Sequence, residues 1–440
     1  MSGIAEILLN MGYEISGSDL NESEQTRRLK ELGAQVFQGH FPSNIKDYHV
    51  VVTSTAIDPN NPELIEARKR NIPIIHRSEM LAELVRLKHG IGVAGTHGKT
   101  TTSSMLAYLL FHGGVNPTAV IGGKVLNFGS NARVGEGKYI VFEADESDGS
   151  FIKLLPSIGI VTNIDADHLD HYKYFNNVKE AFIEYINNIP FYGYSVLCID
   201  DPVVREILPR IERPYVTYGF TDDADLRAVN VRLEESCMKF EAVQGEGSLG
   251  EFSITSLGNH NVLNALSVIA VALDLQVPLE QIREGLAAFQ GVGRRFERIG
   301  EEKGVLVIDD YGHHPTEIRA TLAALKKLDR RLLVIFQPHR YSRTELLWDE
   351  FGQSFANADE IFLAEIYPAG EKPVEGISSS LIAESIEKHE NRKATVIEKF
   401  EDIPDVIAKS AQKGDVIVTL GAGDIYKSGR LIIEKIKEVL

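Results

Sequence analysis

The sequence has few cysteines, no long apolar run and no excess of basic residues. Cys198 and Cys237 are the only cysteines among 440 residues, too few for a disulfide framework, and their scarcity fits a reducing cytosol. No apolar run approaches the roughly 20 residues that a membrane-spanning helix needs. The net charge of −17 argues against a protein that coats nucleic acid. We therefore expect a cytoplasmic protein with no membrane insertion and no nucleic-acid partner.

Length and composition indicate a globular protein with more than one domain. Apolar residues make up 43% of the chain and charged residues 25%, as in ordinary globular proteins. A chain of 440 residues exceeds one hydrophobic core, so two to three domains are expected. Short apolar runs alternate with amphipathic helical patterns, which predicts an α/β fold. The alternation is clearest after residue 294, where it predicts a doubly wound domain with a mostly parallel sheet.

The stretch 91–105, IGVAGTHGKTTTSSM, is typical of a strand, a glycine loop and a helix. Glycines let the backbone wrap a phosphate with its N–H groups pointing inward, and the helix N-terminus adds partial positive charge. Lys99 can reach the terminal phosphates of a nucleotide, and the Thr100 hydroxyl can ligate Mg²⁺. The usual phosphate-loop pattern has a glycine five positions before Gly98, where this chain has Val93. A plain glycine turn is the alternative, but Gly-Lys-Thr after a strand favours nucleotide binding.

Two further strands of the middle region are followed by acidic segments. Glu143 follows the predicted strand 139–142, and the segment after strand 158–162 contains His168. Acidic strand ends beside a phosphate loop indicate a metal site, although loop carboxylates that cap helices are about as common. His168 and His171 could bind zinc, but hard oxygen ligands next to a nucleotide favour Mg²⁺.

The C-terminal region carries polar segments after three of its predicted strands, at 310–315, 338–343 and 421–424. Each segment alone is compatible with ordinary turn chemistry. Because the carboxyl ends of parallel strands meet at one edge of the sheet, the three together predict a ligand site. Arg294 and Arg295 fall at the predicted hinge between domains, where they form either a solvated linker or a clamp on phosphates.

Eight segments resemble the Mur ligase family. In chain order they are GTHGKTTTSSM, FEADESDGSF, TNIDADHLDHY, GNHNVLNALSV, GVGRRFE, DDYGHHPTEI, FQPHRYSRT and LGAGDIY. The resemblance covers essentially the whole chain. It implies three domains: a Rossmann-like domain for a UDP-sugar over 1–88, a phosphate-loop ATPase-like domain over 89–293, and a Rossmann-like domain for an amino acid over 294–440.

The resemblance also implies an activity. Family members drive amide formation with ATP, and the motifs here are most similar to those that join L-alanine to the lactyl carboxylate of UDP-N-acetylmuramate in peptidoglycan precursor synthesis. Transfer of the γ-phosphoryl group to the carboxylate gives an acyl phosphate, which the amine then attacks. ATP and Mg²⁺ are the implied cofactors, and UDP-N-acetylmuramate and L-alanine are the implied substrates. We expect a monomer or a weak homodimer.

Site residues follow from the positions that match the family's motifs. The implied nucleotide loop comprises Gly95, Thr96, His97, Gly98, Lys99, Thr100 and Thr101. Lys99 would neutralise the β- and γ-phosphates. Thr100 and Glu143 would hold one Mg²⁺, and His168 would bind a second near the reacting carboxylate.

Other implied roles lie outside the loop. Asn264 would contact adenine, although from the residues alone its amide could equally cap a helix. Asp310 would bind the ribose hydroxyls, and Arg295 would reach the phosphates when the domains close. The residues that would position alanine and the reacting carboxylate are His313, Arg340 and Arg343. Weaker assignments to uridine and sugar contacts are Asp19, Ser54 and His76.

Three alternative functions remain open at this point. A recycling ligase that attaches a tripeptide to the same UDP-sugar shares the phosphate loop, but the segment 146–150, ESDGS, favours alanine addition. A phosphate-loop kinase would need a hydroxyl acceptor and no amino-acid domain. A nucleotide-switch binding protein would need no residues for a second substrate. The acidic and histidine-rich strand ends in two domains argue against the last two.

The start of the chain differs from the family pattern. Members begin with a strand and a glycine-rich loop that receives the UDP pyrophosphate, and residues 1–3 coincide with the end of that loop. The N-terminal domain is therefore expected to lack its first strand. We expect the natural product to begin about 15–20 residues upstream, enough for one strand, its turn and a short leader. The chain as given would then hold the UDP-sugar weakly.

Overall fold

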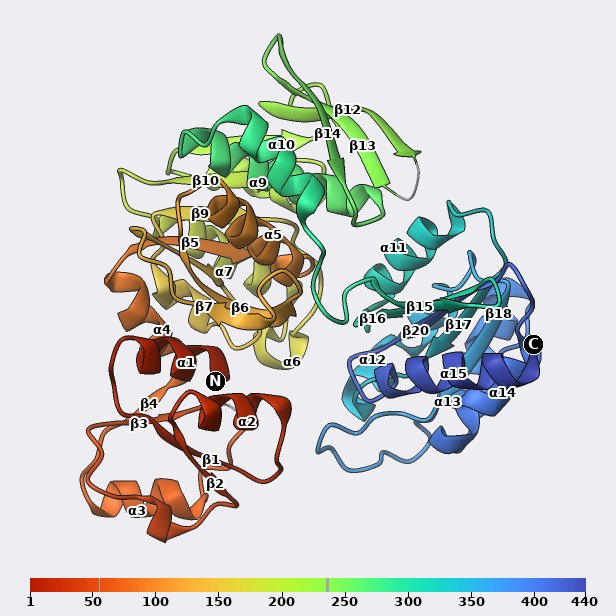
Figure 1. Cartoon of the computed structure of the whole chain (residues 1–440), viewed down its shortest axis with the longest axis horizontal. Helices are drawn as coiled ribbons and strands as arrows, with labels where there is room; N and C mark the ends of the chain where they lie inside the picture. The colour runs from red at the N-terminus through yellow and green to blue at the C-terminus, as the bar shows by residue number, and fades with distance from the viewer. Residues whose placement is uncertain (55, 235–236) are drawn as a thin grey trace. The chain divides into compact units, whose positions relative to one another are not determined.

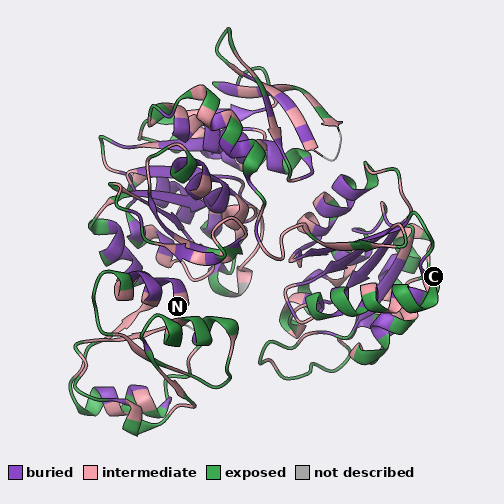
Figure 2. Ribbon diagram, in the orientation of Figure 1, coloured by how far each residue is buried: buried purple, intermediate pink, exposed green. Residues whose placement is uncertain are grey.

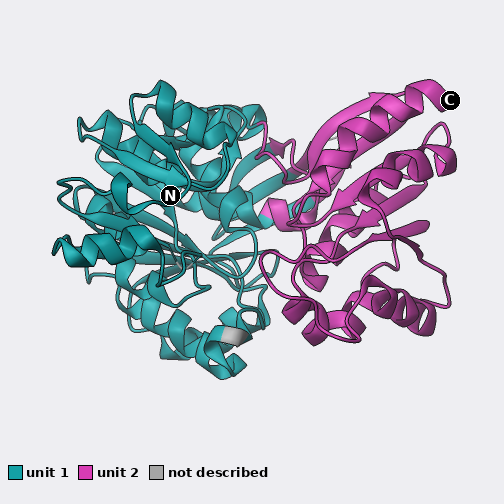
Figure 3. Cartoon of the chain, turned by 90° about the horizontal axis from the view of Figure 1, so that it is seen from below, with its two compact units in different colours: residues 1–230, 240–252, 263–289 teal, residues 231–239, 253–262, 290–440 magenta. Residues whose placement is uncertain are grey.

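The computed structural model describes residues 1–54, 56–234 and 237–440. The chain divides into two compact units, coloured separately in Figure 3. The first contains residues 1–230, 240–252 and 263–289, and the second contains 231–239, 253–262 and 290–440. This division into two does not test the domain boundaries predicted at 88/89 and 293/294, which stay predictions. Across the described ranges, no helix combines the length and apolarity that a bilayer crossing requires.

Residues 1–88 alternate helices and short strands (Figure 1). The elements are α1 Ser2–Asn10, β1 Ser16–Asp19, α2 Glu24–Glu31, β2 Gln35–Gln38, β3 Val51–Thr53, α3 Pro62–Lys69, β4 Ile74–His76 and α4 Arg77–Arg86. The strands pair in parallel, β1 with β2 and β3 with β4, in two separate two-stranded sheets. Ile4 and Ile7 of α1 are buried in the same hydrophobic cluster as Ala132 of the middle region. The apolar face of α1 is therefore covered by the middle region.

The middle region is built on a ten-stranded sheet with the order β14-β13-β12-β11-β10-β9-β5-β8-β6-β7. Its strands are β5 His89–Ala94, β6 Thr118–Val125, β7 Ser130–Arg133, β8 Tyr139–Glu143, β9 Ile158–Val161, β10 Tyr194–Cys198, β11 Tyr215–Gly219, β12 Leu226–Glu234, β13 Cys237–Gln244 and β14 Gly247–Ile254. Its helices are α5 Lys99–His112, α6 Leu169–Tyr172, α7 Phe175–Asn187, α8 Pro202–Ile207, α9 Asn259–Asp274 and α10 Leu279–Ala288. Central β5 is parallel to both β8 and β9. The carboxyl ends of these three strands therefore meet at one edge, where the sequence predicts the nucleotide loop and the acidic segments.

The C-terminal region forms a six-stranded sheet with the order β15-β16-β20-β17-β18-β19. The strands are β15 Glu297–Glu302, β16 Val305–Asp310, β17 Leu332–Phe336, β18 Glu360–Ala364, β19 Thr395–Ile397 and β20 Val416–Leu420. The helices are α11 Pro315–Lys326, α12 Tyr341–Gly352, α13 Ser379–Glu390, α14 Ile403–Ser410 and α15 Tyr426–Val439. Pairing is parallel except for the edge strand β15, which is antiparallel to β16.

Both faces of this sheet are covered by helices. One buried cluster contains apolar residues of α11, α12 and α13, and a second contains residues of α14 and α15. Buried strands between partly exposed helices are visible in Figure 2. The predicted doubly wound domain is confirmed, because strands apolar on both faces need helices on both sides.

Candidate active site

The loop between β5 and α5 has the conformation that the glycine spacing predicts. Gly95 has φ +129°, and a β-carbon there would lie 2.0 Å from the Thr162 hydroxyl oxygen. Gly98 has φ +85° and is the N-cap of α5, where no side chain of the described residues caps the helix. Thr101 lies in the first turn of that helix. The amide groups at the start of α5 are thus left for a ligand such as a phosphate.

Replacing Gly95 with alanine is expected to lower the free energy of unfolding by about 3–5 kcal/mol, because strained backbone and steric overlap add. The matched control is Gly114→Ala, since Gly114 also has positive φ (+76°) but a β-carbon there would meet no described atom within 4 Å. That control should cost only about 1 kcal/mol. Urea unfolding of both variants measures the difference, and equal costs would contradict the close approach to Thr162.

Lys99 lies at the centre of the loop and is paired with a buried carboxylate. Its Nζ donates to both carboxylate oxygens of Glu146 at 2.9 and 2.8 Å, and to the carbonyl oxygens of Gly95 and Thr96 at 2.7 and 3.1 Å. The Glu146 side chain is 1% exposed. Burial alone would lower the pKa of Lys99, but the carboxylates around it, Glu146 first, raise it above its usual value. Lys99 is therefore a fixed positive charge, and Glu146 is a site residue that the sequence reasoning missed within the acidic segment.

Glu143 and Thr100 lie together at the end of β8 and the start of α5. The Thr100 hydroxyl donates to Glu143 Oε2 at 3.1 Å, the Ser103 hydroxyl donates to Oε1 at 3.3 Å, and the Gly122 amide donates to Oε1 at 2.6 Å. Burial raises the pKa of Glu143 above its usual value. A carboxylate in this setting is stabilised by a cation, and paired hydroxyl and carboxylate oxygens are ligands that suit Mg²⁺. The predicted Thr100–Glu143 pair thus fits a divalent ion.

His168 lies beside Glu146. Its Nε2 is 3.7 Å from Glu146 Oε1 and 3.7 Å from Asp167 Oδ2, and its backbone is left-handed at φ +55°. In the described structure, Glu143 thus contacts Thr100, while Glu146 contacts Lys99 and His168. The predicted metal ligands therefore fall into two adjacent groups. Thr100 lies against Glu143, and His168 lies against Glu146.

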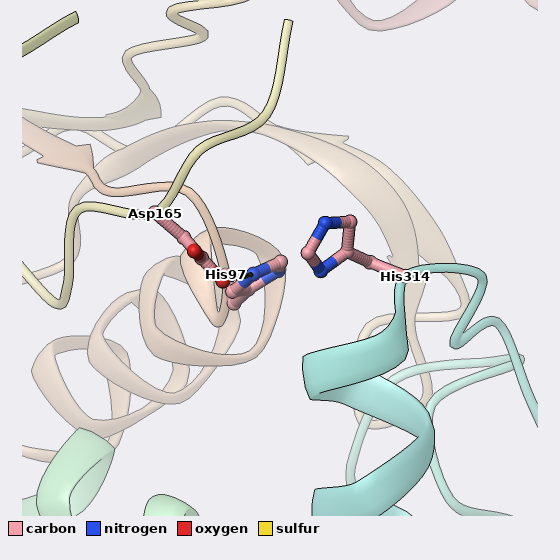
Figure 4. A group of neighbouring side chains, drawn as sticks. All are labelled: His97, Asp165 and His314. Carbon is pink, nitrogen blue, oxygen red and sulfur yellow. Dashed lines mark hydrogen bonds and ion pairs between the residues drawn. The ribbon is translucent and has the colours of Figure 1, made fainter. Parts of the chain in front are cut away.

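The end of β9 holds the other side of the loop. Asn163 Oδ1 accepts from the His97 amide at 2.8 Å, and the His97 carbonyl accepts from Thr162 Oγ1 at 2.6 Å and Asn163 Nδ2 at 2.9 Å. His97 Nε2 lies 3.2 Å from Asp165 Oδ2, and the Asp165 amide donates to the Thr96 hydroxyl oxygen at 2.8 Å. Figure 4 shows the His97 and Asp165 side chains next to each other. Thr162, Asn163 and Asp165 therefore hold the loop in place. The sequence indicated them only as part of the polar segment that follows a strand.

Asn264 lies next to the loop. It is 6% exposed, and a β-carbon at Gly98 would lie 3.0 Å from its Oδ1. Because α9 begins at Asn259, Asn264 is in the second turn and does not cap the helix. The capping alternative is wrong, and the amide is held against the loop.

The residues predicted to contact the UDP-sugar lie at strand ends of the N-terminal region. Thr53 pairs with His76 in the β3–β4 sheet, so Ser54 and His76 lie at the same edge. His76 Nδ1 is 2.7 Å from the Ser78 hydroxyl oxygen, and its Nε2 is 3.8 Å from Asp148 Oδ2. Asp19 ends β1 in the other small sheet and accepts from the Asn21 amide at 3.1 Å. The structure thus brings Ser54 and His76 together, while Asp19 belongs to another sheet.

Asp310 is the last residue of β16, and Arg295 lies just before the start of β15. Asp310 is 7% exposed, and its carboxylate accepts from the amides of Phe296 at 2.8 Å and Gly312 at 2.9 Å. Burial raises the pKa of Asp310. Arg295 Nη1 is 3.6 Å from Glu317 Oε1, and its guanidinium lies 4.8 Å from the Tyr311 ring centre. The Asp310 carboxylate is thus bonded to two backbone amides, and Arg295 is held by the Glu317 carboxylate and the Tyr311 ring.

His313 is a neutral imidazole with a defined tautomer. Its Nδ1 lies 3.1 Å from the Tyr311 carbonyl oxygen, which can only accept, so Nδ1 carries the proton and Nε2 has the lone pair. Burial lowers the pKa of His313 to about 4. Its amide donates to Glu317 Oε2 at 2.9 Å. At neutral pH, His313 therefore presents an acceptor nitrogen rather than a charge.

Arg340 and Arg343 lie at the start of α12. Arg340 has φ +73°, and its amide donates to the Tyr367 carbonyl oxygen at 2.8 Å. Arg343 Nη1 is 3.3 Å from Nδ1 of His339, whose ring stacks on Tyr367 at a centroid distance of 5.6 Å. The His313 and His339 rings lie 6.0 Å apart. The structure thus brings both His313 and Arg343 next to His339, a residue that the sequence analysis did not assign.

The lowered pKa of His313 predicts a pH dependence of stability. The unfolded state binds a proton below about pH 6.5, whereas folded His313 does so only near pH 4, so stability rises with pH across this window. In His313→Asn, the loss of stability between pH 6.5 and 4 should be smaller by up to about 3 kcal/mol. Denaturant unfolding at several pH values measures this, with exposed His49→Asn as control. Parallel curves for wild type and His313→Asn would contradict the prediction.

Three family models match the chain in order. The model described as "Mur ligase family, catalytic domain" matches residues 1–89, "Mur ligase middle domain" matches 93–272, and "Mur ligase, glutamate ligase domain" matches 294–423. A UDP-N-acetylmuramate–L-alanine ligase of Geobacter sulfurreducens is 54% identical over 100% of this chain and 96% of its own length. The Myxococcus xanthus protein of the same name is 50% identical over 99% of this chain and 93% of its own.

Solved structures agree with these matches. The UDP-N-acetylmuramate–alanine ligase of Thermotoga maritima superposes with a TM-score of 0.84 at 30% identity, covering 100% of this chain and 96% of that one. A murein peptide ligase of Psychrobacter arcticus gives a TM-score of 0.72 at 26% identity, covering 100% and 97%. The chain belongs to the Mur ligase family and has its three-domain α/β fold.

Proposed function

We propose that this protein is an ATP-dependent ligase that joins L-alanine to the lactyl carboxylate of UDP-N-acetylmuramate, in the supply of peptidoglycan precursors. The observation that carries the proposal is the identity of about half of all residues, over the full chain, with ligases of that name. Full-length agreement includes the C-terminal region, where an amino-acid site is expected. The reaction activates the carboxylate as an acyl phosphate, which the alanine amine attacks with release of phosphate.

The loop and its carboxylates take the nucleotide in this proposal. Lys99 places a positive charge where the β- and γ-phosphates would lie, and the amides of the loop and α5 would hold their oxygens. Thr100 and Glu143 would hold one Mg²⁺, and His168 would contribute to a second site beside Glu146. Bound Mg²⁺ supplies charge neutralisation for phosphoryl transfer between anions. Asn264 would contact the adenine.

The C-terminal region supplies the amino-acid site. The Nε2 lone pair of His313 would accept from the alanine ammonium, and Arg340 and Arg343 would bind carboxylate groups of the substrates. Asp310 would accept from the ribose hydroxyls, and Arg295 would engage phosphates. The contacts of Asp19, Ser54 and His76 with the UDP-sugar are the weakest part of the proposal.

The deciding experiment measures phosphate release from ATP while each substrate is omitted in turn. We expect sustained release only when UDP-N-acetylmuramate, L-alanine and Mg²⁺ are all present. Formation of ADP and a phosphorylated acceptor without an amino acid, and with no release of inorganic phosphate, would point to a kinase. Absence of any turnover with the complete mixture would leave a binding protein and overturn the proposal.

The recycling ligase is the second candidate, because the murein peptide ligase of Psychrobacter arcticus shares the fold over the full chain. Its TM-score and identity are below those of the Thermotoga maritima alanine ligase. The two activities separate when L-alanine is compared with the tripeptide L-alanyl-γ-D-glutamyl-diaminopimelate as the amine substrate. We expect product with alanine, and preferential use of the tripeptide would favour the recycling activity.

We propose a monomer or a weak homodimer.

A further inference from the structure

Arg294 connects three segments at the carboxyl edge of the C-terminal sheet. Its Nη2 donates to the carbonyl oxygens of Gly421 at 2.9 Å and Gly423 at 3.0 Å, in the loop after β20. Its guanidinium also lies 4.8 Å from the Tyr311 ring centre, after β16, and 4.2 Å from that of Tyr426, the first residue of α15. A planar cation between two rings, with its edge bonded to two carbonyls, can adopt few other positions.

Neighbouring groups also hold the backbone conformation of Arg294 and the position of its charged side chain. Its φ of +62° is left-handed, a conformation that a non-glycine residue keeps only where its surroundings hold it. The Arg294 amide donates to Glu297 Oε2 at 2.7 Å, and its carbonyl accepts from the Tyr311 amide at 2.8 Å. Its Nε lies 3.7 Å from Oδ2 of Asp309, a side chain that is 1% exposed. An arginine in a solvated linker would have none of these constraints.

The loop that Arg294 holds supports the segments carrying Arg340 and Arg343. A β-carbon at Gly423 would lie 2.7 Å from the Tyr367 β-carbon, so the loop packs directly against Tyr367. The Tyr367 carbonyl accepts from the Arg340 amide, and the Tyr367 ring stacks on His339, which contacts Arg343. A continuous set of contacts therefore runs from Arg294 through Gly423 and Tyr367 to both arginines.

We propose that Arg294 is a positioning residue for the amino-acid site: by fixing the loop 421–424 it sets the placement of Tyr367, and through it Arg340 and Arg343. This inference rests on the proposed function only for the identity of the substrate. The neighbouring Arg295 differs, because its side chain is directed to Glu317. The two adjacent arginines thus contact different groups: Arg294 bonds the loop 421–424, and Arg295 pairs with Glu317.

Steady-state kinetics of Arg294→Lys in the full chain test the proposal. Lysine keeps a positive charge near Asp309, which favours folding, but it cannot bond both carbonyls and stack on both rings. We expect the KM for L-alanine to rise about tenfold, with the KM for ATP changed less than about twofold. Arg298→Lys is the matched control, because Arg298 is 65% exposed and pairs with Glu301 in the same strand. An unchanged alanine KM, or a fall in kcat alone, would overturn the inference.

Hydrogen exchange provides a test that needs no activity. The amide of Gly421 donates to the Asp310 carbonyl, and that of Ile425 donates to Gln337 Oε1. In Arg294→Lys, amides over 421–425 should exchange at least about fivefold faster than in wild type, while those of β17 stay unchanged. If wild type lacks alanine-dependent phosphate release, the proposed function fails but this measurement still decides the loop contact. Equal exchange over 421–425 would overturn the positioning role.

Discussion

Replacing Lys99 with alanine is expected to abolish turnover and also to destabilise the protein without nucleotide. Turnover should fall by about a thousandfold or more, because the charge that faces the phosphates is lost. The same change leaves Glu146, 1% exposed, as a buried carboxylate without its cation. Breaking a buried pair in this way costs about 3–5 kcal/mol. Phosphate release and urea unfolding of the same preparation measure the two effects.

Two further variants separate these effects. In Lys99→Ala/Glu146→Gln the uncompensated charge is gone, so stability should recover most of its loss while turnover stays low. Lys124→Ala is the surface control, because its pair with Glu24 is about half exposed on one side and 70% exposed on the other, and such pairs are worth less than about 1 kcal/mol. Near-normal activity of Lys99→Ala would show that the phosphate-loop assignment is wrong. Failure of the double variant to recover stability would contradict the role given to Glu146.

The sequence predicts well those features that depend on local order. A strand, two glycines, a lysine and a helical pattern occur within 15 residues, so their arrangement is fixed by chain connectivity, and the structure reproduces it from β5 to α5. The same holds for the C-terminal strands, whose apolar runs and intervening helices follow one another without interruption. The edge strand β15 was not predicted. Its sequence, ERIGEE, is too polar to indicate a strand, and pairing with β16 stabilises it.

The site was predictable in its residue types but not in its pairings. Glu143, Asp145 and Glu146 stand within four positions, and sequence alone does not tell which one faces Lys99. Glu143 is the last residue of β8, and Glu146 lies in the turn that follows, where side-chain direction depends on the tertiary fold. Arg294 is a similar case. Its side chain bonds the carbonyls of Gly421 and Gly423, about 130 positions later in the chain, a separation over which no local pattern carries information.

Removal of the metal ligands is expected to raise the Mg²⁺ requirement and to lower turnover. Glu143→Gln keeps an acceptor for the Thr100 hydroxyl but removes the charge, and because burial already disfavours that charge, folding should be little affected. His168→Asn suits the left-handed backbone at φ +55°, so its effect reports on the imidazole. Each variant should reduce turnover by about a hundredfold and shift half-maximal activity to higher Mg²⁺.

A control variant and a zinc chelator complete the test of the magnesium assignment. Glu180→Gln removes an exposed carboxylate that pairs with Arg210, and it should leave the Mg²⁺ titration unchanged. Zinc is the alternative, because His168, the N-cap of α6, is followed three positions later by His171 within that helix. Oxygen ligands at Thr100 and Glu143 favour Mg²⁺, so a tight zinc chelator added in excess Mg²⁺ should not affect wild-type turnover. Loss of activity under those conditions would overturn the magnesium assignment, since the chelator would have removed an ion that Mg²⁺ cannot replace.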